Sequence, residues 1–186
     1  MRVILAKTAG FCFGVDRAVN MAYELANSGA RAATLGQLIH NSLVTDDLAA
    51  KGVRIISSPA EAQRGETVII RAHGVAAEVY EELKGTGAEI CDATCPFVKK
   101  IHRIVAENSG EDTEVIIAGD PNHPEVIGIK GHCKGEVNIF NSEAELDEII
   151  KKDGKNYDKR IIAVSQTTFS QKVWKICKEK IKKYYT

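Results

Sequence analysis

Two of the five cysteines, Cys12 and Cys95, stand where thiol chemistry is favoured. Cys12 lies in the glycine-flanked run of residues 10–14, and Pro96 follows Cys95. Each cysteine precedes a segment with helical periodicity, and proline suits the first helical position because it has no N–H to lose. The dipole and free amides of a helix N-terminus favour the thiolate, which binds iron or attacks electrophiles. A small buried side chain is the alternative for each cysteine, and without a local Cys-x-x-Cys spacing both alternatives stay open.

The other three cysteines have different surroundings. Cys91 ends a predicted strand, and Cys177 follows Val173 by four residues on the apolar face of a predicted helix. We therefore expect these two side chains to pack in hydrophobic cores. Cys133 lies near two glycines, and its surroundings favour neither a packing role nor a chemical one.

Three histidines, His40, His73 and His123, lie in loops that follow predicted strands. Histidine donates hydrogen bonds to anions and carries positive charge near neutral pH. A single histidine in such a loop more often has a structural role. Three histidines at equivalent positions make a shared anion-binding site as good an interpretation as three structural roles. His102 and His132 lie in helical or glycine-rich segments, where we expect structural roles. The sequence has no G-x-x-x-x-G-K loop, which argues against a nucleotide phosphate site.

Glu125 is the one carboxylate beside these histidines, since only Pro124 separates it from His123. In a closed pocket or near an anion its proton affinity would rise, which suits a proton donor. Capping of a helix N-terminus is the alternative role. Thr167 and Thr168 follow a later predicted strand, and their hydroxyls could bridge a carboxyl group and a substrate oxygen.

The elements that must position these residues alternate along the chain. Short β-branched runs predict strands at residues 3–5, 32–35, 53–56, 68–70, 89–91, 115–118, 137–140 and 161–164. Apolar periodicity predicts helices at residues 15–27, 41–51, 76–84, 97–107, 126–130, 143–151 and 170–185. This alternation predicts an α/β fold with mostly parallel sheets, arranged as a first αβα lobe at residues 1–96 and a second at residues 97–186. In such sheets ligands bind where strands end and loops begin, which is where the residues above lie.

The composition narrows the class of protein. Apolar residues make up 44% of the 186 residues and charged residues 27%, as in ordinary globular domains. Basic and acidic residues number 25 each, so no overall field favours nucleic acid or an anionic membrane. We find no apolar run of about 20 residues and no signal peptide, so we expect a cytoplasmic protein with no membrane partner.

Five segments, in this order, resemble signatures of the 4-hydroxy-3-methylbut-2-enyl diphosphate reductase family. They are GFCFGVDRA at residues 10–18, AHGV at 72–75, DATCP at 92–96, HPEVIG at 123–128 and QTT at 166–168. Each segment alone is moderately specific, and the five in order are very specific. The family fold has three αβα lobes around a 4Fe–4S cluster, of which this chain resembles the first two.

The resemblance implies roles for the residues identified above. Cys12 and Cys95 match two of the three cysteine ligands of the cluster. By the same resemblance, the residues that bind the substrate diphosphate are His40, His73 and His123. Glu125 matches the proton donor, and Thr167 matches the hydroxyl that links it to the substrate's alcohol.

The implied activity belongs to isoprenoid biosynthesis. It is the reductive dehydration of 4-hydroxy-3-methylbut-2-enyl diphosphate to isopentenyl and dimethylallyl diphosphate, the last step of the methylerythritol phosphate pathway. A ferredoxin- or flavodoxin-type protein is the implied electron donor. The family's third cysteine and its serine–asparagine motif are not found before Thr186. We therefore expect this polypeptide alone to hold no catalytically competent cluster.

Two other interpretations remain open. The chain could be a diphosphate-binding module that keeps the histidines without redox activity. It could also be a zinc protein that uses Cys12, Cys95 and a histidine.

Overall fold

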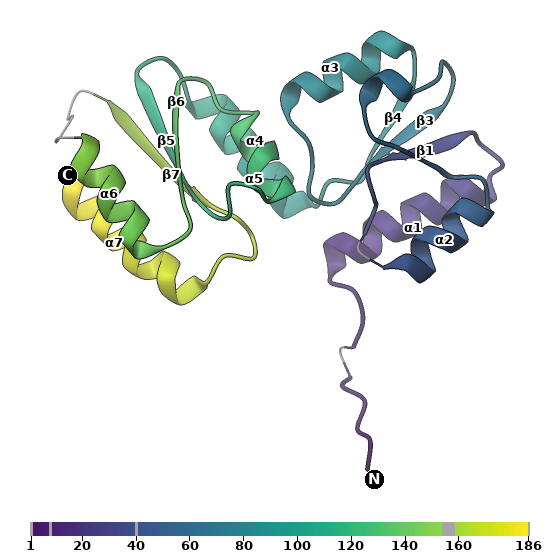
Figure 1. Cartoon of the computed structure of the whole chain (residues 1–186), viewed down its shortest axis with the longest axis horizontal. Coiled ribbons are helices and arrows are strands. Elements are labelled where there is room, and N and C mark those ends of the chain that lie inside the picture. Colours follow the sequence, from purple (N-terminus) through teal and green to yellow (C-terminus); the bar gives the residue numbers. More distant parts are fainter. Residues whose placement is uncertain (1, 8, 40, 154–158, 186) are drawn as a thin grey trace. The chain divides into compact units, whose positions relative to one another are not determined.

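The computed structural model describes residues 2–7, 9–39, 41–153 and 159–185. The chain divides into two compact units (Figure 1). The first comprises Met1–Ala72 and Glu82–Cys95, and the second comprises His73–Glu81 and Pro96–Thr186. None of the helices in the described ranges is long and apolar enough to cross a membrane.

The first unit is built on a parallel sheet in the order β2-β1-β3-β4. Its strands are β1 (Ala32–Leu35), β2 (Arg54–Ile56), β3 (Thr67–Ile70) and β4 (Glu89–Asp92). The helical elements of this half are α1 (Phe13–Asn27), α2 (Ser42–Ala50), the 3₁₀ turn η1 (Pro59–Glu61) and the second half of α3 (Ala77–Thr86), whose first five residues group with the second unit. Helices α1 and α2 lie on one face of the sheet and α3 lies on the other (Figure 1).

Apolar burial and one polar cap account for these elements. Ala18, Val19 and Ala22 form the buried face of α1, as the periodicity predicts. The three buried residues of β3 are all aliphatic, as expected for a parallel strand covered on both faces. The Asn41 side chain accepts a hydrogen bond from the Val44 amide at 3.4 Å and so caps α2, which confirms the predicted helix start.

The second unit contains a parallel sheet in the order β6-β5-β7. Its strands are β5 (Thr113–Ala118), β6 (Glu136–Phe140) and β7 (Arg160–Ser165), and its helices are α4 (Pro96–Asn108), α5 (Pro124–Lys130), α6 (Glu143–Asp153) and α7 (Gln171–Tyr185). Val115 and Ile117 of β5 pack in one core with α4 and α5. Ile116 and Ala118 point the other way, into a core with α6 and α7. The alternation of the strand therefore places two helices on each face.

Each sheet has one pair of neighbouring strands whose following helices lie on opposite faces, and the direction of winding changes there. Strand β1 leads to α2 on one face of the first sheet, while its neighbour β3 leads to α3 on the other (Figure 1). In the second sheet β5 leads to α5, and its neighbour β7 leads to α7 on the opposite face. The loops leaving such a strand pair diverge and open a crevice at the carboxyl ends of the strands, where ligands bind in open α/β sheets.

The α/β fold with parallel sheets is confirmed, but the predicted strand at residues 3–5 is wrong. Val3, Ile4 and Leu5 are 78%, 76% and 83% exposed, and no described strand pairs with them. A short β-branched run forms a strand only when a neighbour supplies the ladder hydrogen bonds.

The division into units differs in two respects from a single cut after residue 96, the first being that Pro96 already belongs to the second unit. Residues 73–81 group with the second unit, because the Ala77 amide donates a hydrogen bond to the Gly131 carbonyl at 3.2 Å. The domain boundary at 96/97 stays a prediction.

Candidate functional site

The clearest polar arrangement lies at the change of winding in the second sheet. Glu125, in the first turn of α5, is only 2% exposed. One of its carboxyl oxygens accepts the Thr167 amide at 2.6 Å, and the other accepts the Thr167 hydroxyl at 2.8 Å. Thr167 follows β7 and is exposed, so its hydroxyl joins a buried carboxyl group to the surface. A carboxyl group so placed can exchange a proton with a bound molecule through that hydroxyl.

Gln166 connects the two loops of this crevice, a role that the sequence did not suggest. Its side-chain oxygen accepts the Asp120 amide at 3.2 Å, and its side-chain nitrogen donates to the Thr168 hydroxyl at 2.8 Å. Thr168 therefore supports the loop, whereas Thr167 contacts Glu125. A Cβ atom at Gly119 would lie 2.9 Å from the Gln166 side-chain oxygen and 2.7 Å from Val126. In the sequence, only the glycine directly after the predicted strand indicated that another segment could pack this closely.

Two of the predicted histidines lie together beside this pair. His123 caps α5, because its Nδ1 accepts the Glu125 amide at 3.1 Å. An accepting Nδ1 places the proton of the neutral ring on Nε2, which leaves that atom as a hydrogen-bond donor. The His73 ring meets the His123 ring edge to face, with centroids 5.2 Å apart. The second unit thus gathers His73, His123, Glu125 and Thr167.

Tight packing holds the His73 segment against α5. His132 Nε2 donates to the Val75 carbonyl at 3.0 Å. A Cβ atom at Gly131 would come within 2.2 Å of the Ala76 Cβ, so only glycine permits this approach. His102 stacks on His132 with centroids 4.2 Å apart. His102 and His132 therefore act as structural residues, as predicted, and they fix the segment that carries His73.

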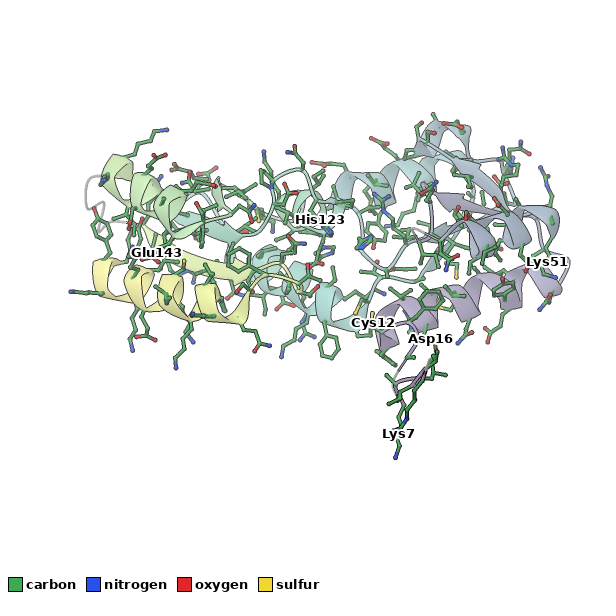
Figure 2. All side chains as sticks on the ribbon, turned by 60° about the horizontal axis from the view of Figure 1, so that its bottom comes forward. Lys7, Cys12, Asp16, Lys51, His123 and Glu143 are labelled. Carbon is green, nitrogen blue, oxygen red and sulfur yellow. The ribbon has the colours of Figure 1, made fainter. Side chains whose placement is uncertain are left out.

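The two candidate ligand thiols occupy helix N-termini in the first unit. Cys12 is exposed and is the N-cap residue of α1 (Figure 2). Cys95 immediately precedes α4, as predicted. A Cβ atom at Gly14 would lie only 2.7 Å from Cys95 Sγ, so the Cys95 sulfur packs against the first turn of α1. Arg17 of the same helix donates to the Thr94 carbonyl at 3.3 Å, which holds the two segments together.

These two positions fit thiolate ligands of a metal cluster. Cys12 is the N-cap residue of α1 and the Cys95 sulfur packs against the first turn of the same helix, and the amino end of a helix favours negatively charged groups. Gly14 lacks a side chain at the closest approach, which leaves room for the Cys95 sulfur. Within the described ranges, no three His, Cys, Asp or Glu side chains gather to hold a metal ion. His40, the third predicted histidine, lies outside the described residues.

The remaining cysteines are packed thiols. Cys177 is fully buried in the core beneath α6 and α7, and Cys91 packs against the core of the first unit. Burial raises the pKa of both thiols. The Cys133 thiol donates to the Ile129 carbonyl at 3.2 Å, and burial raises its pKa to about 11. The packing roles predicted for Cys91 and Cys177 are confirmed, and Cys133 joins them.

Comparison with known proteins places the chain in a family. Residues 3–186 match the family model described as LytB protein. The chain therefore belongs to the LytB family.

Its relatives carry one name. The chain is 42% identical over 186 residues to 4-hydroxy-3-methylbut-2-enyl diphosphate reductase of Caldanaerobacter subterraneus subsp. tengcongensis, covering 98% of this chain and 62% of that protein. It is 42% identical over 170 residues to the reductase of the same name from Geobacter sp. strain M21, covering 91% of this chain and 58% of that protein. The chain thus spans about three-fifths of the length of these relatives.

Two solved structures are similar to it. One is (E)-4-hydroxy-3-methyl-but-2-enyl diphosphate reductase, described as the terminal enzyme of the non-mevalonate pathway. It is 36% identical with a TM-score of 0.78, and the match covers 98% of this chain and 64% of the other. The other is E-1-hydroxy-2-methyl-but-2-enyl-4-diphosphate reductase from Plasmodium falciparum, 28% identical with a TM-score of 0.83 over 95% of this chain and 55% of the other.

The burial of the thiols predicts the order of their alkylation. At pH 8 iodoacetamide should label Cys12 first and leave Cys133 and Cys177 nearly unlabelled. With a pKa of about 11, only about one Cys133 thiol in a thousand is ionised at that pH, and its labelling should rise about tenfold per pH unit toward pH 10. Mass spectrometry of time points measures this, with the urea-unfolded chain as control. Equal labelling rates of Cys12 and Cys177 in the folded chain would contradict it.

The Glu125–Thr167 pair predicts a stability difference between two substitutions. Thr167→Val removes the hydroxyl donor to the buried carboxyl group and should lower the free energy of unfolding by about 1–3 kcal/mol. Thr167→Ser keeps the hydroxyl and should change it by less than about 0.5 kcal/mol. The single tryptophan, Trp174, packs against the core of the second unit, so its fluorescence in urea reports this transition. Equal losses for both variants would show that the hydroxyl contributes nothing.

Proposed function

We propose that this chain provides the diphosphate-binding and proton-donating residues, and two cluster ligands, of a 4-hydroxy-3-methylbut-2-enyl diphosphate reductase. The reaction is the reductive dehydration of that substrate to isopentenyl and dimethylallyl diphosphate, the last step of the methylerythritol phosphate pathway. The observation that carries the proposal is the buried Glu125 carboxyl group, which contacts the exposed Thr167 hydroxyl beside the paired rings of His73 and His123.

The two histidines suit an anionic group. His123 presents Nε2–H because its other nitrogen is used in capping α5. The edge-to-face contact keeps the His73 ring within reach of the same anion. Each neutral ring can donate one N–H hydrogen bond, so the pair suits the oxygen acceptors of a diphosphate. We assign His40 to the same group by resemblance.

Glu125 and Thr167 suit the delivery of a proton to a leaving oxygen. When the carboxyl group is protonated, it donates to the Thr167 oxygen, reversing the direction of the 2.8 Å hydrogen bond. The Thr167 hydroxyl proton then passes to the substrate's alcohol oxygen, so the C–O bond breaks with water rather than hydroxide leaving. The Thr167 amide at 2.6 Å keeps the carboxyl group in place during this transfer.

Cys12 and Cys95 are the residues that would hold a 4Fe–4S cluster. Such a cluster, when bound, supplies two electrons one at a time and an iron that acts as a Lewis acid on the allylic oxygen. We propose a ferredoxin- or flavodoxin-type electron donor. All five cysteines are free thiols, which supports a reducing setting such as the cytoplasm.

Binding of inorganic pyrophosphate tests the histidine assignment. Asparagine is a good N-cap residue, so His123→Asn should keep the cap of α5 while removing the ring donor. We expect its pyrophosphate affinity, measured by calorimetry, to fall at least about tenfold, which corresponds to about 1.4 kcal/mol. The urea midpoint should stay unchanged, which separates lost binding from lost folding. Unchanged affinity in His123→Asn would remove His123 from the site.

Anaerobic reconstitution tests the cluster assignment. The family resemblance requires a third thiolate, so we expect the polypeptide of residues 1–186 alone to retain fewer than four irons and to show no turnover. Iron and sulfide analysis together with an assay with reduced methyl viologen measures both. A stoichiometric 4Fe–4S cluster with turnover would refute the prediction, whereas one equivalent of zinc after aerobic purification would favour a zinc site at Cys12 and Cys95.

A further inference from the structure

Arg71, at the end of β3, carries a charge that no described carboxylate neutralises. Its Nε is buried and has no hydrogen-bond partner among the described residues. Burial lowers the pKa of Arg71, and no acidic side chain among the described residues opposes this shift. Arg54, on the edge strand of the same sheet, differs because it donates to both Glu66 carboxyl oxygens at 3.0 and 2.9 Å. A partly buried charge without a counter-ion costs free energy, so the position calls for an explanation.

The guanidinium group lies where the first sheet changes winding direction. Strand β3 pairs with β1, and the residues that follow these strands are Arg71 and Gly36. A Cβ atom at Gly36 would lie 2.9 Å from Arg71 Nη1, so the arginine side chain crosses from β3 to the end of β1. Gly36 also has a φ of +71°, a conformation that side chains other than glycine rarely adopt. The chain thus provides a glycine where the guanidinium group needs space.

Each sheet places an ionisable side chain near the carboxyl ends of the strand pair at which its winding changes. In the second sheet the Glu125 carboxyl group contacts Thr167, at the carboxyl ends of β5 and β7. In the first sheet the Arg71 guanidinium group lies beside Gly36, at the carboxyl ends of β1 and β3. Open α/β sheets bind ligands at these strand ends, and a guanidinium fork matches phosphate oxygens in pairs.

We infer that Arg71 is the charged residue of an anion-binding site in the first unit, and that this site takes a phosphate-type oxyanion. The residue as a whole is partly buried, and its Nε is enclosed. An anion there neutralises the charge that the described residues leave uncompensated. Neither Arg71 nor Gly36 belongs to the site proposed above, so this inference stands separately from the proposed function.

The Nε–H signal of Arg71 in ¹H–¹⁵N correlation spectra tests the site directly. The signal is identified by its loss in Arg71→Lys. Titration of the 186-residue chain with inorganic phosphate, and separately with pyrophosphate, should shift this signal in a saturable way. The Arg54 signal is the internal control and should stay in place because Glu66 already occupies its donors. An unmoved Arg71 signal, an equal shift with sodium chloride at matched ionic strength, or a stronger response to acetate than to phosphate would overturn the inference.

Two glycine substitutions separate the contact from backbone strain. Gly36→Ala adds a Cβ atom 2.9 Å from Arg71 Nη1 at a φ of +71°. Gly52→Ala introduces similar strain, at a φ of +88°, with nothing within 4 Å. We expect Gly36→Ala to weaken the phosphate response of the Arg71 signal at least about tenfold, and Gly52→Ala to leave it unchanged. Equal effects would refute the role of Gly36.

His123→Asn distinguishes this site from the histidine site. The Arg71 response should persist in that variant even where pyrophosphate binding by the histidines is lost. Loss of the Arg71 response in His123→Asn would mean that one ligand at the histidine site causes both effects, and would overturn a separate site.

Discussion

The arrangement of the second unit depends on the hydrogen bonds of one buried carboxyl group. Glu125 is 2% exposed, and both of its oxygens are satisfied by Thr167 alone. A buried carboxyl group without such partners would be costly. The pair therefore fixes the loop after β7 against the start of α5, and the His123 cap on the Glu125 amide extends the same network by one residue. These contacts fix the position and orientation of the Glu125 carboxyl group and connect it to the exposed Thr167 hydroxyl.

Close backbone approach is the second constraint, and glycines make it possible. Gly131 admits Ala76 against the end of α5, Gly119 admits Gln166 beside β5, and Gly14 admits the Cys95 sulfur beside α1. In each case a Cβ atom would come within 3 Å of its neighbour. These glycines determine where a sulfur, an amide side chain and a histidine-bearing segment lie, although none of them can take part in chemistry.

Much of the fold was predictable from local patterns. The periodicity of α1 and the Asn41 cap of α2 are local properties, and the structure confirms them. The strand at residues 3–5 was wrong because strand formation depends on a partner that a local pattern does not contain. For the site, strand ends predicted where Glu125, His73 and His123 would lie, but the role of Gln166 depends on its contacts with Gly119 and Asp120, which cross from the loop after β7 to the loop after β5.

The sequence by itself determined the α/β class, the positions of the helices and of all strands but the one expected at residues 3–5, the order of the family segments and the packing of Cys91 and Cys177. These follow from residue type and local spacing, which act over a few residues. Only the tertiary structure decided that Thr167 rather than Thr168 contacts Glu125, that His73 meets His123 edge to face, and that Arg71 crosses to Gly36. Each of these contacts joins residues distant in the chain, and the strand order and side-chain packing that bring them together are properties of the folded whole.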